Sequence, residues 1–143
     1  MPDWRQKSAW DCGLTATRLV LRGVRKRPRP DLQQILGTSA HDGTDPRQLE
    51  TVLRQHGLGV LSGEFHGDDL AYLTGRGAPV ACLVQSEGVG HWVVVSSADG
   101  RVVRYQDPAE GPKVLPWPAW LARWRDVDRL GAIYRQWGVA AWR

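Results

Sequence analysis

Four residues of this sequence carry side chains that together can break an amide bond: Cys12, His91, Asp107 and Gln6. A cysteine thiolate attacks a carbonyl carbon, and a neighbouring imidazole transfers the protons that the reaction requires. A carboxylate on the other ring nitrogen orients that imidazole. We therefore predict that Cys12 is the nucleophile, His91 its proton-transfer partner and Asp107 the group that orients His91. The amide of Gln6 is predicted to donate a hydrogen bond to the oxyanion.

The predicted nucleophile lies at the start of a predicted helix over residues 12–22. Apolar side chains recur along one side of this segment, and Gly23 suits the position just after its end. The N-terminus of a helix carries partial positive charge and free N–H groups, which favour a thiolate over a thiol. Asp11, next to Cys12, is interpreted as the capping residue, with a position near the site that tunes Cys12 as the alternative.

The other two members of the predicted triad belong to neighbouring predicted strands. His91 opens a valine-rich strand over 91–97, and Asp107 follows a strand over 101–106. The dipeptide Asp99-Gly100 between them indicates a tight hairpin. Because side chains meet across an antiparallel ladder, we expect His91 and Asp107 to lie close together.

The remaining pattern predicts an α+β chain, with N-terminal helices packed on a C-terminal antiparallel sheet. The active site would then lie in the cleft between the two halves. A helix over 32–36 is predicted to be capped by Asp31. The next is predicted to be capped by Thr44 or Asp45, with Pro46 in its first turn and Gly57 after its end. A short helical turn at 68–73, a helix over 118–125 and strands over 78–84, 113–115 and 132–137 complete the prediction.

Each candidate also has a purely structural interpretation. Cys12 could be a buried apolar residue, His91 a strand-end histidine, Asp107 the opening of an Asp-Pro turn, and Gln6 a surface residue. The catalytic hypothesis rests on their combination and order. The other histidines lack this context: His41 and His66 lie in predicted loops, and His56 lies in the last turn of a helix, where a positive charge is favoured in any case.

The length of 143 residues fits one domain, so we expect residues 1–143 to form a single peptidase domain. No apolar stretch approaches the ~20 residues of a membrane span. The N-terminus has no apolar region typical of a secretory signal, so we expect cytoplasmic synthesis, with delivery into another cell left open. Cys82, in a buried apolar run, is interpreted as structural. Two separated cysteines predict neither a disulfide nor a zinc site, and no cofactor is expected.

Much of the net charge of +4 comes from a basic run between Arg22 and Arg29. A run of this kind binds nucleic acid or an acidic partner in some proteins, and forms a solvated loop in many others. Pro28 and Pro30 favour the loop, and no nucleic-acid-binding motif accompanies the run. We therefore predict a solvated loop, with steering of an acidic substrate as the alternative.

Three motifs together resemble the bacteriocin-processing peptidase family of papain-like cysteine peptidases. They are Gln6 with Trp10-Asp11-Cys12-Gly13, then Gly90-His91-Trp92-Val93-Val94-Val95, then Gln106-Asp107-Pro108. The resemblance implies a papain-like fold and cleavage after a Gly-Gly pair. It assigns Cys12, His91, Asp107 and Gln6 the four roles given above.

Family members often form the N-terminal domain of peptide-exporting ABC transporters, whereas this sequence has neither membrane spans nor a phosphate-binding Gly-Lys-Ser/Thr loop. The resemblance therefore implies a free-standing form that either trims a Gly-Gly leader or acts as an antibacterial effector. Its substrate would be a peptide or protein with a Gly-Gly pair. Its further partner would be an exporter if it trims a leader, or an immunity protein if it is an effector. Glutamine deamidation and acyl transfer are alternatives, because a thioester reacts with water or with an amine.

Overall fold

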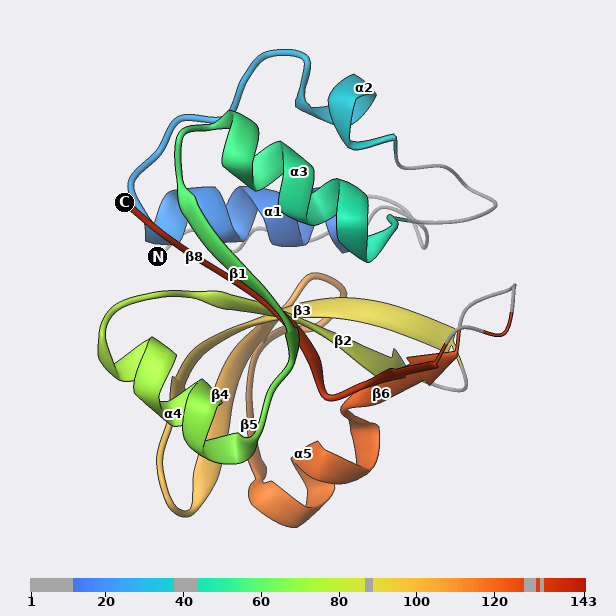
Figure 1. Ribbon diagram of the computed structural model, residues 1–143. Coiled ribbons are helices and arrows are strands. Elements are labelled where there is room, and N and C mark those ends of the chain that lie inside the picture. Colours follow the sequence, from blue (N-terminus) through green and yellow to red (C-terminus); the bar gives the residue numbers. More distant parts are fainter. Residues whose placement is uncertain (1–11, 38–43, 87–88, 128–130, 132) are drawn as a thin grey trace.

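The computed structural model describes residues 12–37, 44–86, 89–127, 131 and 133–143. Within these ranges, an N-terminal layer of helices packs on one face of an antiparallel sheet, and α4 and α5 lie on its other side (Figure 1). This arrangement confirms the predicted α+β class. No helix in these ranges is both long and apolar enough to cross a membrane. The helices are α1 (Cys12–Gly23), α2 (Leu32–Leu36), α3 (Pro46–Gln55), α4 (Gly67–Gly75) and α5 (Trp117–Arg123).

In the described part of the chain, six strands form the main sheet in the order β1-β8-β2-β3-β4-β5, and each neighbouring pair is antiparallel. β6 and β7 form a separate two-stranded ribbon. β8 therefore lies inside the sheet, between β1 and β2 (Figure 1). The strands are β1 (Gly59–Glu64), β2 (Val80–Ser86), β3 (Val89–Ala98), β4 (Val102–Asp107), β5 (Gly111–Pro116), β6 (Arg125–Val127), β7 (Ile133–Arg135) and β8 (Trp137–Trp142).

The β3–β4 hairpin forms as predicted. Asp99 closes its turn, because Oδ1 accepts hydrogen bonds from the N–H groups of Arg101 at 2.7 Å and Val102 at 2.9 Å. Val94 then pairs with Gln106 across the ladder. This register places the start of β3 beside the end of β4, which are the two ends that carry His91 and Asp107.

Apolar side chains form one core on each face of the sheet. The first core joins α1 and α3 to the sheet and includes Trp92, which is 2% exposed. The second core lies under α4 and α5 and includes Trp120 and Trp124, both fully buried with ring centroids 5.5 Å apart. Burying one large apolar side chain contributes about 1.5–3 kcal/mol, so both cores hold the helices on the sheet.

The end of α1 differs from the prediction. Gly23 is the last residue of the helix rather than the residue after it. The left-handed residue is Arg25, at φ 58°, and the N–H of Lys26 closes the turn on the carbonyl of Leu21 at 2.8 Å. Gly23 packs closely on Pro79 instead, since a Cβ there would approach the Pro79 ring to 3.2 Å.

Two of the predicted helix caps, Asp45 and Asp31, have opposite outcomes. Asp45 caps α3, since its side chain accepts a hydrogen bond from the N–H of Arg47 at 2.7 Å. Asp31 precedes α2, but its side chain makes no capping hydrogen bond. The Asp31 carboxylate instead pairs with the Arg29 guanidinium at 3.1 Å. The prediction of an Asp31 cap was therefore wrong, because an arginine two residues away competes for the same oxygens.

The C-terminal strands are more numerous than predicted. The single strand expected over 132–137 is two strands, β7 and β8, separated by Gln136 at φ 50°. β1 was not predicted, because its sequence contains two glycines and only two large apolar residues. Pairing with β8 along its whole length supplies what local propensity lacks.

His56 is a buried structural residue. It is 4% exposed, its Nδ1 bonds to the carbonyl of Val52 at 2.8 Å, and its Nε2 accepts the N–H of Arg29 at 3.1 Å. This pattern requires a neutral ring, so the interpretation of His56 as a favoured cation was wrong. The ring ties the loop before α2 to the end of α3.

We expect His56→Leu to lower the free energy of unfolding by about 1–3 kcal/mol, because the substitution removes a buried hydrogen bond to the Val52 carbonyl and a part-buried one to the Arg29 N–H. Urea unfolding followed by circular dichroism measures the change. The exposed neighbour Gln55 provides the control, since Gln55→Leu should change stability by less than about 0.5 kcal/mol. Equal effects of the two substitutions would show that the His56 ring does not tie the loop before α2 to the end of α3.

Candidate active site

The structure brings His91 and Asp107 into direct contact at one end of the β3–β4 hairpin. His91 Nε2 and Asp107 Oδ1 are 2.7 Å apart. The residues are only 8% and 3% exposed. A hydrogen bond of this length between charged groups is among the strongest in proteins, and it fixes the ring plane of His91.

The turn after β4 holds the Asp107 carboxylate in place. Oδ1 also accepts the backbone N–H groups of Ala109 at 2.7 Å and Glu110 at 3.3 Å. Burial alone would raise the pKa of this carboxyl, but the bond and charge of His91 and the two N–H groups lower the pKa below its usual value. Asp107 is therefore an anion at neutral pH.

His91 is held in its protonated form. Burial disfavours the charged ring, but hydrogen bonds to Asp107 and Cys12, together with their charges, raise the pKa of His91 to about 9. Because Nε2 bonds to Asp107, Nδ1 is the nitrogen that remains for the sulfur of Cys12. His91 therefore lies between a carboxylate and a sulfur and is an imidazolium at neutral pH.

Cys12 is the first residue of α1, and it is 7% exposed. The helix packs against β3, which brings the sulfur to the ring of His91. The partial positive charge of the helix N-terminus favours an anion at this position. The other cysteine, Cys82, lies fully buried in β2, where burial raises the pKa of its thiol, so it is poorly suited to attack.

Thr44 joins the two elements that carry Cys12 and His91. Its carbonyl accepts a hydrogen bond from the indole N–H of Trp92 at 3.1 Å. Its side chain packs so closely on Gly13 that a Cβ there would overlap it. Thr44 thus sets the spacing between the start of α1 and β3. From the sequence, Thr44 was predicted only as a possible helix cap, because its contacts with Gly13 and Trp92 leave no signal in the residues next to it.

A second glycine contact lies on the other side of His91. A Cβ on Gly90 would overlap the carboxylate of Asp126 in β6. The β6–β7 ribbon therefore lies directly beside the start of β3, and it was not predicted. Two close backbone approaches, at Gly13 and Gly90, thus flank the residues Cys12 and His91.

Several candidates cannot be placed. Gln6, Asp11 and His41 lie outside the described residues, so their assigned roles stay predictions. His66 is described, and it lies exposed just before α4, outside the group formed by Cys12, His91 and Asp107.

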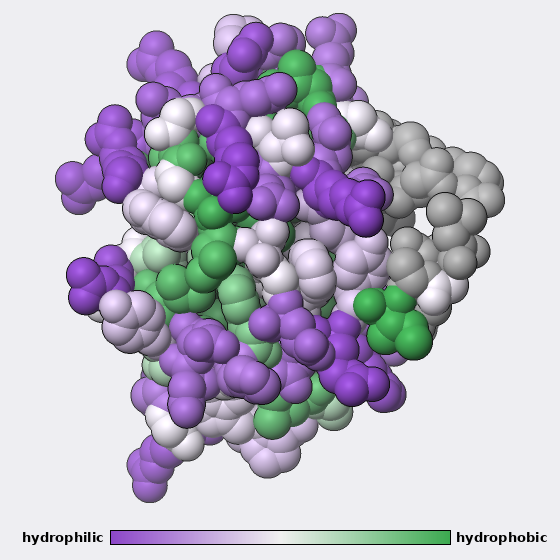
Figure 2. All heavy atoms as spheres, in the orientation of Figure 1, coloured by the Kyte–Doolittle hydropathy of each residue, from purple (hydrophilic) through white to green (hydrophobic). Residues whose placement is uncertain are grey.

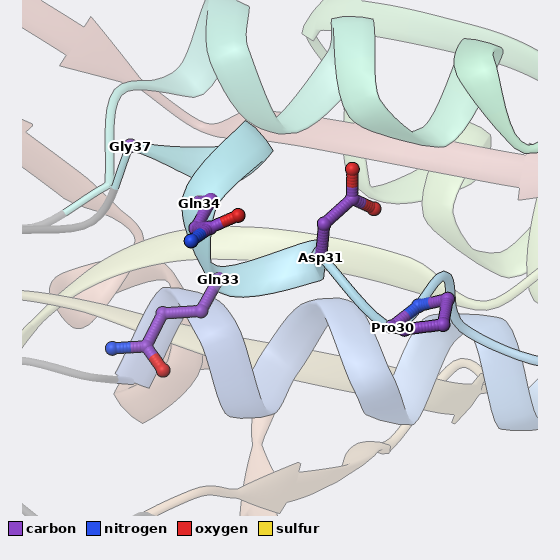
Figure 3. Close-up of a pocket in the computed structure, with 5 residues that line it drawn as sticks. All are labelled: Pro30, Asp31, Gln33, Gln34 and Gly37. Carbon is purple, nitrogen blue, oxygen red and sulfur yellow. The ribbon is translucent and has the colours of Figure 1, made fainter.

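A large open hollow elsewhere on the surface has a different character. It has a volume of about 760 Å³ and is lined by Pro30, Asp31, Gln33, Gln34 and Gly37, on and around α2 (Figure 3). These side chains include no nucleophile and no acid–base pair. Among the described residues, no group of three or more His, Cys, Asp or Glu side chains could hold a metal ion.

The peptidase C39 family model matches residues 2–127 of the 143 residues. The chain belongs to the peptidase C39 family. It is therefore a cysteine peptidase, as the sequence motifs predicted. No curated protein sequence matches this C39 peptidase.

Solved peptidase domains share the fold of this C39 peptidase. A double glycine motif protease from an AMS/PCAT transporter, in complex with the leader peptide, has a TM-score of 0.74 at 17% identity, with 99% of this chain and 91% of that chain covered. The peptidase domain of Streptococcus ComA, a bi-functional ABC transporter involved in quorum sensing, has a TM-score of 0.71 at 15% identity. The alignment covers 97% of this chain and 96% of that chain. The peptidase domain of Streptococcus mutans ComA has a TM-score of 0.68 at 11% identity, covering all of both chains. These likenesses confirm the papain-like fold.

We expect NMR titration of the His91 ring to give a midpoint near pH 9. Because this folded-state pKa lies above the unfolded value near 6.5, protonated His91 stabilises the fold fully below about pH 6.5, and this stabilisation is lost as the pH rises through about 9. Asp107→Asn and Cys12→Ala should each lower the midpoint, because each removes an anionic or hydrogen-bonding partner. A midpoint that neither substitution moves would contradict the described contacts.

We expect Gly13→Ala to slow alkylation of Cys12 by iodoacetamide by about tenfold, because the new methyl group pushes Thr44 away and shifts α1 relative to His91. The substitution should also lower stability by about 1–3 kcal/mol. Gly75→Ala in α4 is the control, since a Cβ there meets nothing within 4 Å. An alkylation rate unchanged by Gly13→Ala would show that Thr44 does not set the site geometry.

Proposed function

We propose that this cysteine peptidase uses Cys12 as nucleophile, His91 as acid and base, and Asp107 as the orienting residue. The observation that supports this most directly is the 2.7 Å contact of His91 Nε2 with Asp107 Oδ1, on a ring that also bonds to Cys12. The second ring nitrogen then faces the sulfur. This order of carboxylate, imidazole and sulfur suits acyl transfer to a thiolate.

The proposed reaction has two halves. The Cys12 thiolate attacks the carbonyl carbon of the scissile bond, and the resulting oxyanion accepts hydrogen bonds from the backbone N–H of Cys12 and from Gln6. His91 gives its Nδ1 proton to the amine, which leaves as the new N-terminus. A water molecule then attacks the thioester, His91 takes its proton, and the carboxylic product leaves with Cys12 restored as a thiolate and His91 protonated again.

We further propose that the scissile bond follows a Gly-Gly pair. The solved structure of a double glycine motif protease with its leader peptide shares this fold. Cys12 and His91 are each less than a tenth exposed, and close contacts at Gly13 and Gly90 flank them. In this proposal, substrate residues without side chains suit a cysteine and a histidine of such low exposure.

The substrate is proposed to be a peptide precursor that carries a leader, because the similar structures are leader-peptide and quorum-sensing peptidase domains. An exporter that takes up the trimmed product is the partner that this role requires. We also propose that residues 1–143 form one peptidase domain. The effector hypothesis, with its immunity protein, has no supporting contact or comparison.

We expect the purified protein to cut a synthetic leader peptide after its Gly-Gly pair, and mass spectrometry identifies both fragments. Cys12→Ala should abolish cleavage. Cys82→Ala is the matched control and should retain it, because Cys82 is buried in β2 away from the site. A Cys12-dependent mass gain of about one dalton on a glutamine, without fragments, would instead indicate deamidation.

A further inference from the structure

We propose that a basic hollow at the C-terminal end of α1 binds an acidic segment of the polypeptide substrate; this inference rests on the proposed peptidase function. The hollow has a volume of about 250 Å³. Its lining is Arg18, Arg22, Arg25, Lys26, Arg27 and Pro28. The first two come from α1, and the others from the segment that follows it, residues 24–31, which we call the basic loop. Figure 2 shows mostly hydrophilic side chains at the upper left of the molecule, where the segment after α1 runs in Figure 1.

The basic loop has a defined conformation. The N–H of Arg25 bonds to the carbonyl of Arg22 at 3.0 Å, and the N–H of Lys26 bonds to that of Leu21 at 2.8 Å. Arg25 adopts a left-handed conformation, which costs a residue with a Cβ free energy. Near the other end of the loop, the N–H of Arg29 bonds to buried His56. These contacts fix the backbone that carries the cations, and Arg25 and Arg27 are exposed, in keeping with the predicted solvated loop.

Three cations of the hollow, Arg25, Lys26 and Arg27, lie on the basic loop beyond the end of α1. Arg29, the last cation of the run, lies outside the hollow, and both of its bonds to Asp31 (3.1 and 3.2 Å) neutralise it locally. None of the described lining residues is acidic. The negative end of the α1 dipole favours a cation in the last helical turn, but its effect does not extend to Lys26 and Arg27. An anionic ligand would offset the remaining repulsion.

The lining favours carboxylates over nucleic acid. Single-stranded nucleic acids bind through aromatic platforms on which the bases stack. No aromatic residue is found among the described residues that line this hollow. Arginine and lysine side chains with aliphatic stems are instead suited to glutamate and aspartate side chains.

A substrate held at a Gly-Gly pair needs contacts elsewhere, because glycine has no side chain to bind. α1 carries Cys12 at its first residue and reaches the hollow at its last turn. At about 1.5 Å per residue, the two ends of this helix are roughly 16 Å apart. An extended peptide at about 3.3 Å per residue spans this distance with about five residues. The hollow therefore lies within reach of a chain whose scissile bond is at Cys12.

The test uses Cys12→Ala protein, in which binding is measured without cleavage. Two fluorescent peptides carry a Gly-Gly pair and, about five residues away, either a block of glutamates or the same block of glutamines. The test variant combines Arg25→Gln, Lys26→Gln and Arg27→Gln. The control variant combines Arg47→Gln, Arg101→Gln and Arg104→Gln, which removes equal charge from exposed sites outside the hollow.

We expect the test variant to bind the glutamate peptide on the order of tenfold more weakly, while the control variant changes binding by less than about twofold. The glutamine peptide should bind all proteins equally. Backbone amide NMR signals of the basic loop should shift when the glutamate peptide is added to protein without the loop substitutions.

Equal weakening by both variants would overturn the proposal, because it would show attraction to net charge alone. Equal binding of both peptides, or tighter binding of a single-stranded RNA than of the glutamate peptide at the basic loop, would also overturn it. Cleavage of the glutamine peptide by protein that retains Cys12 tests the peptidase function separately. Failure of that cleavage would refute the proposed function, whereas failure of the binding test would refute only the proposal that the hollow binds an acidic segment of the substrate.

Discussion

The hydrogen bond between His91 and Asp107 is the interaction on which the site depends. It joins the end of β4 to the start of β3, it is almost fully buried, and it holds a positive ring where burial alone would favour a neutral one. The sheet register, the turn after Asp107 and the packing of α1 all serve to place this pair beside Cys12. A charged pair of this kind exists in an apolar setting only because each partner is hydrogen-bonded.

Much of this arrangement could be predicted from the sequence, because it is encoded locally. The Asp99-Gly100 turn sets the hairpin, so His91 and Asp107 had to come together once their strands were identified. The family match confirms the class of enzyme that the motifs predicted. The catalytic roles of the individual residues stay predictions, and Gln6 among them lies outside the described residues.

The parts that could not be predicted depend on contacts between distant segments. Thr44 contacts Gly13 and Trp92, which lie 31 and 48 residues away, and only the folded chain shows that it spaces two elements. His56 lies in the last turn of a helix, where the sequence favours a cation, yet its Nε2 accepts a backbone N–H from 27 residues away. β1 has weak strand propensity and exists because β8 pairs with it.

The position of β8 has a consequence for how the enzyme is made. This strand, the last of the described chain, lies between β1 and β2, so the sheet cannot close until the ribosome has released residues 137–142 from its exit tunnel. Until then β1 has no partner strand, and the first core lacks Val139 and Ala141. The nascent chain therefore carries Cys12 before it carries the strand that closes the sheet around the first core.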